Sequence, residues 1–347
     1  MISRPNLTRN SSFELLRLVL MCMIVVHHGI VHGLGLSELG WGNMARYQFS
    51  LSGYDAGIAI TINSLCICAV NCFVLISGYF GIRLSGRKVV SLLLTTLFFT
   101  IIFVTGYNIW QHDYKKSLFS LLFLSHTDYW FVVDYIFLMF FAPVFNKYHG
   151  KVLVWLMLIV SCWFGFIWNF QANPNGYTLF QFFLLYCIGR YIRTNNISIS
   201  RSKSILLYLG GALAVATLFY MFYVNGMNEL AWKMTRYNNP LIILSGIGLF
   251  MLFKSFTIKS GIINKLAKST FAIYLFQNSD AISSYYYDFV NYLSLETSIC
   301  EILLIIILLT IVIFVCAIII DKVEKIINIK LLSALLSRFP ILYRQIE

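Results

Sequence analysis

Five side chains that can carry charge or move a proton lie in the first apolar segment of the chain. They are Glu14, Arg17, His27, His28 and His32. Ionisable groups inside such a segment are costly to bury, so each is a functional candidate. Histidine exchanges protons near neutral pH and arginine binds anions. The segment therefore indicates either proton-transfer chemistry or side chains that only hydrogen-bond to neighbouring helices.

Helical spacing sorts these residues into faces. Arg17 and His28 are eleven residues apart, about 20° past three full turns, so they share a face, about 16 Å apart along the axis. Glu14 precedes Arg17 by three residues and can pair with it. His27 is rotated about 100° from His28, so no shared role is expected. His32 lies one turn above His28 on nearly the same face.

Metal binding is the other chemistry that such a histidine pair allows. His28 and His32, at positions i and i+4, are compatible with zinc. No HExxH sequence and no carboxylate partner accompanies them, so we expect no metal. Cys66 and Cys68, two residues apart, point to different sides of a helix and favour packing.

The composition shows which solvent surrounds these groups. Of the 347 residues, 59% are hydrophobic and only 12% are charged, against about 25% charged in a soluble domain. A helix of about 20 apolar residues crosses a bilayer. Spans are predicted at 13–33, 56–80, 89–110, 130–146, 152–170, 178–193, 204–224, 239–256, 269–290 and 297–320. The predicted fold class is all-α, a polytopic membrane helix bundle of about ten transmembrane helices, with the lipid bilayer as a partner.

Basic residues set the expected orientation, because Lys and Arg concentrate in cytoplasmic loops. With both termini cytoplasmic, most of the 26 basic residues fall on that side. The opposite loops then carry only Arg46, Lys115, Lys116, Lys233 and Arg236. The net charge of +12 is thus flank charge of membrane helices, and nucleic acid is not an expected partner.

The chain carries no large hydrophilic domain, so residues 1–347 are expected to form a single integral membrane domain. The run 117–124 is too short to cross and is expected in the interface or under a loop. Residues 326–347 form a predicted cytoplasmic tail, in which 331–343 has an interfacial amphipathic pattern. The three tyrosines at 285–287 are expected in an aromatic belt.

Five segments carry a family resemblance in order along the chain. They are FELLRLVLMCMIVVHHGI with Glu14, Arg17 and His28, then NCFVLISGYFG (71–81), YWFVVDYIFLMFFAPVFN (129–146), FFLLYCIGRYIR (182–193) and STFAIYLFQNS (269–279). This combination, over about residues 11–325, resembles the membrane acyltransferase-3 family. The family's first segment has an acidic residue, then Arg, ten residues and His.

The resemblance implies a multi-pass enzyme of a bacterial plasma membrane that modifies sugars or surface polysaccharides. We expect an O-acetyltransferase that moves acetyl from cytoplasmic acetyl-CoA to a hydroxyl of a cell-surface or lipid-linked polysaccharide. Acetyl-CoA is the donor, and no cofactor is expected to stay bound. A glycan or lipid-linked sugar transporter or flippase is the alternative, although no internal repeat supports it. A sensing or scaffold protein, in which His28 would have no role, is a third possibility.

The expected catalytic residues are His28, Arg17 and Glu14. Hydroxyl acylation needs a base, and an apolar surround favours the neutral imidazole of His28 that accepts the proton. Arg17 would orient the anionic donor or pair with Glu14. A covalent acyl carrier, if one forms, would be His28 or Ser77. A basic cluster could bind CoA phosphates or only anchor the membrane: Arg83, Arg87 and Lys88.

Four further residues are expected to contact substrate: Trp130, Asp134, Gln277 and Asn278. Trp130 could stack on a sugar or anchor the interface, and Asp134 could line the acceptor path. The family often has histidine where this chain has Gln277. An amide cannot act as a base but can hydrogen-bond, which makes His28 the single expected base.

Overall fold

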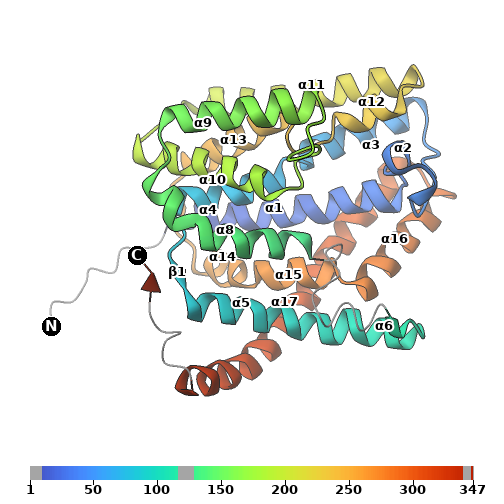
Figure 1. Cartoon of the computed structure of the whole chain (residues 1–347). Helices are drawn as coiled ribbons and strands as arrows, with labels where there is room; N and C mark the ends of the chain where they lie inside the picture. Colours follow the sequence, from blue (N-terminus) through green and yellow to red (C-terminus); the bar gives the residue numbers. More distant parts are fainter. Residues whose placement is uncertain (1–9, 116–128, 339–344, 347) are drawn as a thin grey trace.

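The computed structural model describes residues 10–115, 129–338 and 345–346, which form a bundle of roughly parallel helices (Figure 1). Its first half contains α1 (Ser12–His28), α2 (Glu38–Trp41), α3 (Gly53–Cys66), α4 (Ala69–Phe80), α5 (Gly86–Phe99), α6 (Gly106–Trp110), α8 (Trp130–Lys147) and α9 (Lys151–Leu158). The second half contains α10 (Leu179–Thr194), α11 (Arg201–Val224), α12 (Asn228–Lys233), α13 (Pro240–Lys254), α14 (Gly261–Leu266), α15 (Thr270–Gln277), α16 (Asp280–Ser294) and α17 (Ile299–Arg338). Two short strands, β1 (Leu84–Ser85) and β2 (Gln345–Ile346), pair antiparallel. The all-α prediction is confirmed.

Six helical stretches in the described part are long and apolar enough to cross a membrane. They are Ser12–Gly33, Gly53–Phe80, Gly86–Trp110, Trp130–Lys147, Arg201–Val224 and Ile299–Leu335. Each coincides with a predicted span. Two apolar stretches, Lys151–Ile167 and Pro240–Lys254, also match predicted spans but are shorter. The membrane class is supported, whereas the number ten and the orientation stay predictions.

The predicted span 269–290 is not one helix. α15 ends at Gln277 and α16 begins at Asp280, so Asn278 and Ser279 form a break. Asn, Ser and Asp favour such breaks because their side chains compete for backbone hydrogen bonds. Here the Ser279 hydroxyl donates to the Phe276 carbonyl at 2.6 Å. Non-helical backbone at membrane depth is tolerated where it is enclosed by protein or lines a cavity.

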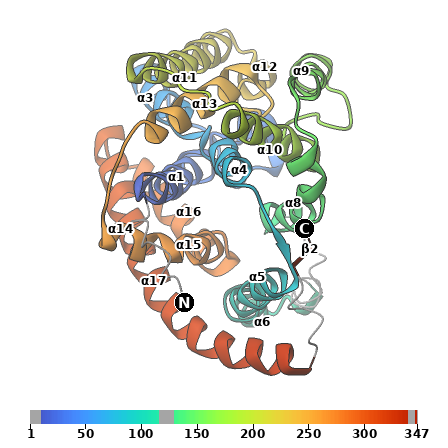
Figure 2. The same cartoon turned by 90° about the vertical axis from the view of Figure 1, so that its left-hand side faces the viewer.

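α1 and α4 occupy the centre of the bundle (Figure 2). α1 contacts α3, α4, α13, α15 and α17, and its side chains Leu16, Leu20 and Val25 are fully buried. α17 runs along one side of the bundle and continues to Arg338, beyond the predicted span 297–320. At a rise of about 1.5 Å per residue, the length of α17 exceeds the thickness of a bilayer.

The predicted interfacial run 117–124 lies outside the described residues, as do residues 339–343 of the predicted stretch 331–343.

The closest helix packing is between α4 and α10. A Cβ atom at Gly78 would overlap the Tyr186 backbone carbonyl, and one at Gly189 would overlap that of Leu75. The Tyr186 hydroxyl donates to Asn146 Oδ1 at 2.7 Å and accepts from the backbone of Ile82 at 2.8 Å. These contacts fix α4, α8 and α10 against one another around the central helix.

Candidate active site: a cavity along the first helix

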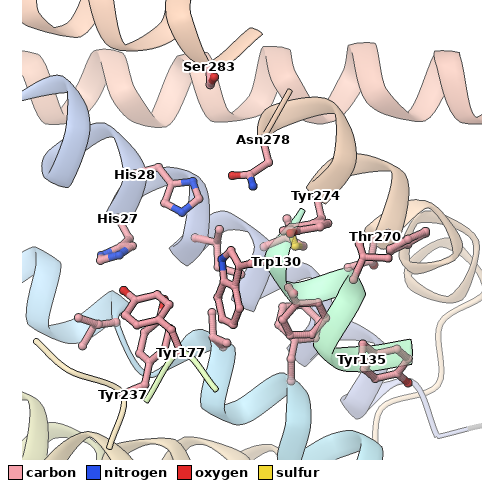
Figure 3. Close-up of a pocket in the computed structure, with 18 of the residues that line it drawn as sticks. His27, His28, Trp130, Tyr135, Tyr177, Tyr237, Thr270, Tyr274, Asn278 and Ser283 are labelled. Atoms are coloured by element: carbon pink, nitrogen blue, oxygen red, sulfur yellow. The ribbon is translucent and has the colours of Figure 1, made fainter. Parts of the chain in front are cut away.

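A cavity of about 840 Å³ follows α1 from its first turn to beyond its last. The lining residues from this segment recur every three or four positions: Glu14, Arg17, Met21, Ile24, His28 and Val31, with His27 and His32 beside them. One face of α1 therefore lines the cavity along the helix, and Figure 3 shows His27 and His28 at its far end. The structure brings Arg17 and His28 to this face, as their spacing predicts.

One end of the cavity is basic. Arg17 forms an ion pair with Glu14 at 2.8 Å, and the Glu14 side chain is almost fully buried. Lys268 lines the same end, next to Thr270. Ser77 on α4 also lines the cavity, and its hydroxyl lies 3.4 Å from that of Tyr135. We refer to Glu14, Arg17 and Lys268 as the basic end.

His28 lies in the middle of this wall. Its Nδ1 is 3.1 Å from Oε1 and 2.9 Å from Nε2 of the fully buried Gln277 amide. Gln277 also hydrogen-bonds to Tyr287. No hydrogen bond to the other ring nitrogen, Nε2, is found within the described parts of the chain. One nitrogen of His28 is thus held by protein and the other is available to a substrate.

His27 also borders the cavity but is anchored differently. Its Nδ1 lies 2.6 Å from Asn63 Oδ1 on α3, and its side chain is buried. The two imidazole centroids, of His27 and His28, are 5.6 Å apart. His27 therefore bonds to a neighbouring helix, whereas His28 bonds to the end of α15.

An aromatic wall faces His28 across the cavity (Figure 3). Trp130, at the start of α8, stacks on Tyr237 at 6.2 Å and packs edge-on against Tyr177 at 5.1 Å. The Tyr237 carbonyl accepts hydrogen bonds from the amides of Asn71 at 2.9 Å and Gln181 at 3.0 Å. Burial raises the pKa of the Tyr237 phenol, so it stays protonated, and it is hydrogen-bonded to Tyr177.

The opposite end of the cavity is aromatic. A π-helical turn, Gly29–Gly33, follows α1 and carries His32, whose ring lies 5.0 Å from Tyr287 and 5.4 Å from Trp41. Trp41 in turn packs against Trp232 at 6.1 Å. π-helical turns recur at functional sites. We refer to His32, Trp41, Trp232 and Tyr287 as the aromatic end.

Not every predicted site residue lies at the cavity. Trp130 and Asn278 line it with Glu14, Arg17 and His28, and Gln277 lies directly behind His28. Asp134 is buried on α8 and does not line it. The predicted CoA cluster also lies elsewhere, exposed between α4 and the first turn of α5: Arg83, Arg87 and Lys88.

Several lining residues escaped the prediction. Tyr177, Trp41 and Trp232 lie in connections or short helices between predicted spans, where no periodic pattern assigns a face. The expected aromatic belt is wrong for two of its members, since Tyr286 is buried against α1 and Tyr287 lines the cavity. The side chains of consecutive helical residues point in directions about 100° apart around the helix axis, so three in a row cannot all face lipid.

No group of three or more His, Cys, Asp or Glu residues positioned to hold a metal ion occurs in the described part of the chain. The cysteines of the chain are free, and several, such as Cys68 and Cys72, are buried among apolar neighbours. The side chains that line the cavity offer imidazole, hydroxyl, amide, carboxylate and basic groups.

A family model described as an acyltransferase domain matches residues 10–321. No curated protein and no solved structure matches the chain. The matched range contains every residue that lines the cavity, from Glu14 to Tyr287. The resemblance drawn from the five segments is thus confirmed. With several helices suited to spanning a membrane, the chain is a multi-pass membrane protein that belongs to the acyltransferase-3 family.

Proposed function

We propose that the protein is an O-acetyltransferase that moves acetyl from acetyl-CoA to a hydroxyl of a cell-surface or lipid-linked polysaccharide. The observation that carries this proposal is the position of His28. Its free nitrogen faces one continuous cavity with a basic end, suited to an anionic donor, and an aromatic end, suited to a sugar. The cavity volume is in the range of small-molecule sites, which run from about 300 to 1,000 Å³.

The chemical step assigns a place to each atom. His28 Nε2 accepts the proton of the acceptor hydroxyl while its oxygen attacks the thioester carbonyl carbon. The new C–O bond forms, the C–S bond breaks, and the departing thiolate takes up the proton from the imidazolium. The Tyr237 phenol and the Asn278 amide line the same cavity, where a hydrogen bond donated by either would stabilise the carbonyl oxygen as it gains negative charge.

The proposal also places the protein in a bacterial plasma membrane with the basic end on the cytoplasmic side. Loop charge supports this orientation. The start of α1 is tied to the segment after α13 by hydrogen bonds from Ser11 N to Ile258 O at 2.8 Å and from Ser12 Oγ to Phe256 O at 2.8 Å. Both segments are predicted to be cytoplasmic, where acetyl-CoA is found.

The test is His28→Ala in the native host, with O-acetyl measured on the purified surface polysaccharide and membrane levels of the protein checked in parallel. A general base contributes about 10² to 10⁴ in rate, so we expect acetylation to fall at least about 100-fold. His149→Ala is the matched control, because His149 lies outside the cavity and bonds to the Phe145 carbonyl.

Unchanged acetyl content in the His28→Ala strain would show that His28 is not the base. Loss of the entire polysaccharide from the surface, with acetyl retained on an internal pool, would instead support the transporter. Dependence on acetyl-CoA separates the two classes in purified protein, because an acyltransferase consumes the thioester and a flippase does not.

A further inference from the structure

Lys268 is a cation of the basic end that has no partner for its charge among the residues that the structure describes. It lines the cavity from the 3₁₀ turn Ala267–Ser269 that precedes α15. Within the described residues its ammonium group forms no hydrogen bond and no ion pair. Arg17, the other cation there, is paired with Glu14. The basic end therefore carries one net positive charge, located on Lys268.

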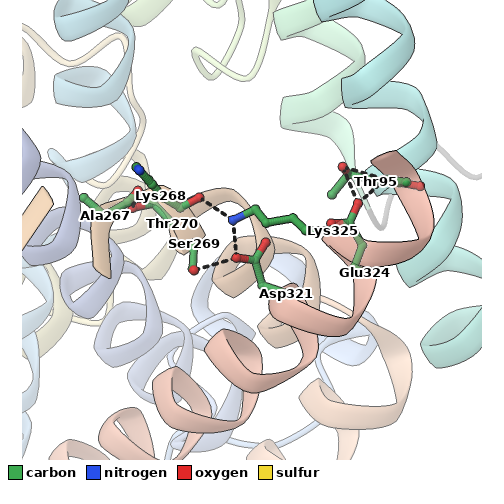
Figure 4. A network of polar contacts seen from close by, with 9 residues as sticks. Thr95, Ala267, Lys268, Ser269, Thr270, Asp321, Glu324 and Lys325 are labelled. Atoms are coloured by element: carbon green, nitrogen blue, oxygen red, sulfur yellow. Dashed lines mark hydrogen bonds and ion pairs between the residues drawn. The ribbon is translucent and has the colours of Figure 1, made fainter. Parts of the chain in front are cut away.

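The turn that carries Lys268 is braced by α17 (Figure 4). The buried Asp321 carboxylate accepts a hydrogen bond from Ser269 Oγ at 2.6 Å and pairs with Lys325. Lys325 also donates to the backbone carbonyl of Lys268 at 3.4 Å. Lys325 is thus used to hold the turn, while the side chain of Lys268 extends away from the network in Figure 4.

The same stretch of α17 is fixed on its other side. Glu324 accepts hydrogen bonds from Thr95 Oγ1 at 2.6 Å and from the Asn328 amide, which ties α17 to α5. Glu324 is nearly inaccessible to solvent. Because the turn is held on a backbone carbonyl and a side-chain hydroxyl, the backbone at Lys268 is fixed at the mouth of the cavity, which the exposed Lys268 side chain lines.

We propose that Lys268, with Arg17 beside it, forms the subsite for the phosphate groups of the acyl donor. The inference rests on the proposed function and assigns the phosphate contact to the cavity, not to the exposed cluster of Arg83, Arg87 and Lys88. Ammonium and guanidinium groups form charge-assisted hydrogen bonds with phosphate oxygens. A donor held there extends its thioester along the face of α1 toward His28. An anionic lipid headgroup would offer the same phosphate chemistry.

Direct binding tests this proposal without any need for turnover. The protein is reconstituted in phosphatidylcholine nanodiscs, and the Kd values of coenzyme A and of phosphate-free pantetheine are measured by calorimetry. A hydrogen bond to a charged group is worth enough to change affinity about tenfold or more. We expect Lys268→Gln to raise the Kd of coenzyme A by that factor and to leave the Kd of pantetheine unchanged. Lys268→Arg should keep most of the affinity for coenzyme A.

The matched control is Lys265→Gln, because Lys265 is exposed on the preceding helix α14 and does not line the cavity. We expect its Kd for coenzyme A to stay within twofold of the wild type. The proposal is overturned if Lys268→Gln binds coenzyme A normally, or if wild type binds none. It is equally overturned if neutralising the exposed basic cluster removes binding while Lys268→Gln does not.

A lipid occupant gives a distinct result. Phosphatidylglycerol in the nanodisc would then raise the melting temperature of the wild type but not of Lys268→Gln, with coenzyme A affinity equal in both, and that outcome also overturns the proposal. Failure of the proposed function is separate. If His28→Ala retains full acetylation while Lys268 governs coenzyme A binding, the subsite stands and the role of His28 falls.

Discussion

Gln277 decides which nitrogen of His28 can act on a substrate. Neutral imidazole carries one proton, and the partner of one nitrogen determines where it sits. Nε2 of the Gln277 amide lies 2.9 Å and Oε1 lies 3.1 Å from His28 Nδ1. The proposed mechanism uses the orientation in which the amide NH₂ donates to the Tyr287 hydroxyl and Oε1 accepts the proton held on Nδ1. His28 Nε2 is then unprotonated and faces the cavity as a base. In the proposed mechanism Gln277 is therefore a positioning residue, whereas the sequence analysis predicts a substrate contact.

Replacing Gln277 with methionine tests this role. Methionine keeps the length of the side chain but cannot accept a proton from Nδ1. Because the wrong tautomer has no basic nitrogen at the cavity, kcat should fall about tenfold to 100-fold while the KM for both substrates stays the same. Tyr287→Phe, which removes only the group that orients the amide, should lower kcat less. A drop in kcat of under twofold for Gln277→Met would contradict the assignment.

The sequence predicts one half of this site and misses the other for a physical reason. Arg17 and His28 lie on one helix, so the helical period alone places them on a common face. Gln277 is 249 residues away from His28 along the chain, and no local rule joins them. Lys268 reads as an ordinary membrane-flanking lysine until the turn that carries it is seen to close against α1.

At the scale of helices and turns, three of the family-like segments meet in close packing. Gly78, Gly189 and the Tyr186–Asn146 hydrogen bond belong to three different segments and meet where α4, α8 and α10 touch. Small residues permit such close backbone approach in membrane bundles. The remaining two segments supply His28 and Gln277. The family pattern thus combines a packing centre with a reactive centre.

Gly78→Ala and Gly189→Ala should each destabilise the protein by about 1–3 kcal/mol, the usual cost of overpacking. The added methyl group meets backbone atoms of the facing helix, which cannot rotate out of the way. The measurement is the melting temperature of detergent-purified protein, followed by fluorescence-detected size exclusion. Gly210→Ala is the control, since nothing lies within 4 Å of a Cβ there. Equal melting temperatures for Gly78→Ala and Gly210→Ala would contradict this prediction, because α4 and α10 would then move apart enough to accept the methyl group.

The break between α15 and α16 shows why hydropathy alone predicts helices that are too long. Residues 269–290 contain enough apolar side chains to predict one span, but the Asn278–Ser279 pair ends the helix. The break places Asn278 in the cavity and Gln277 behind His28.

On the scale of the whole molecule, loops predicted to lie on one side contact one another. Arg46 pairs with Asp288 at 2.6 Å, and Arg236 donates to Asn169 Oδ1 at 2.5 Å. All four residues belong to segments predicted outside the cytoplasm or at the outer ends of spans. The segments at Ser11 and Ser260, predicted cytoplasmic, are likewise hydrogen-bonded to each other. These contacts fit the predicted sidedness of the loops, which puts the basic and aromatic ends of the cavity toward opposite sides of the membrane.

Reporter fusions test this arrangement. A fluorescent protein fused after Glu347 should fold and emit, and alkaline phosphatase at the same place should be inactive, because the C-terminus is predicted in the cytoplasm. Fusions that truncate the chain after Asp113, which follows α6, should show the opposite pattern, since seven predicted spans, an odd number, separate Asp113 from Glu347. Active phosphatase after Glu347 would mean an odd number of crossings or a reversed bundle. A reversed bundle would turn Arg17 and Lys268 away from cytoplasmic acetyl-CoA, so the donor side of the proposed reaction depends on this result.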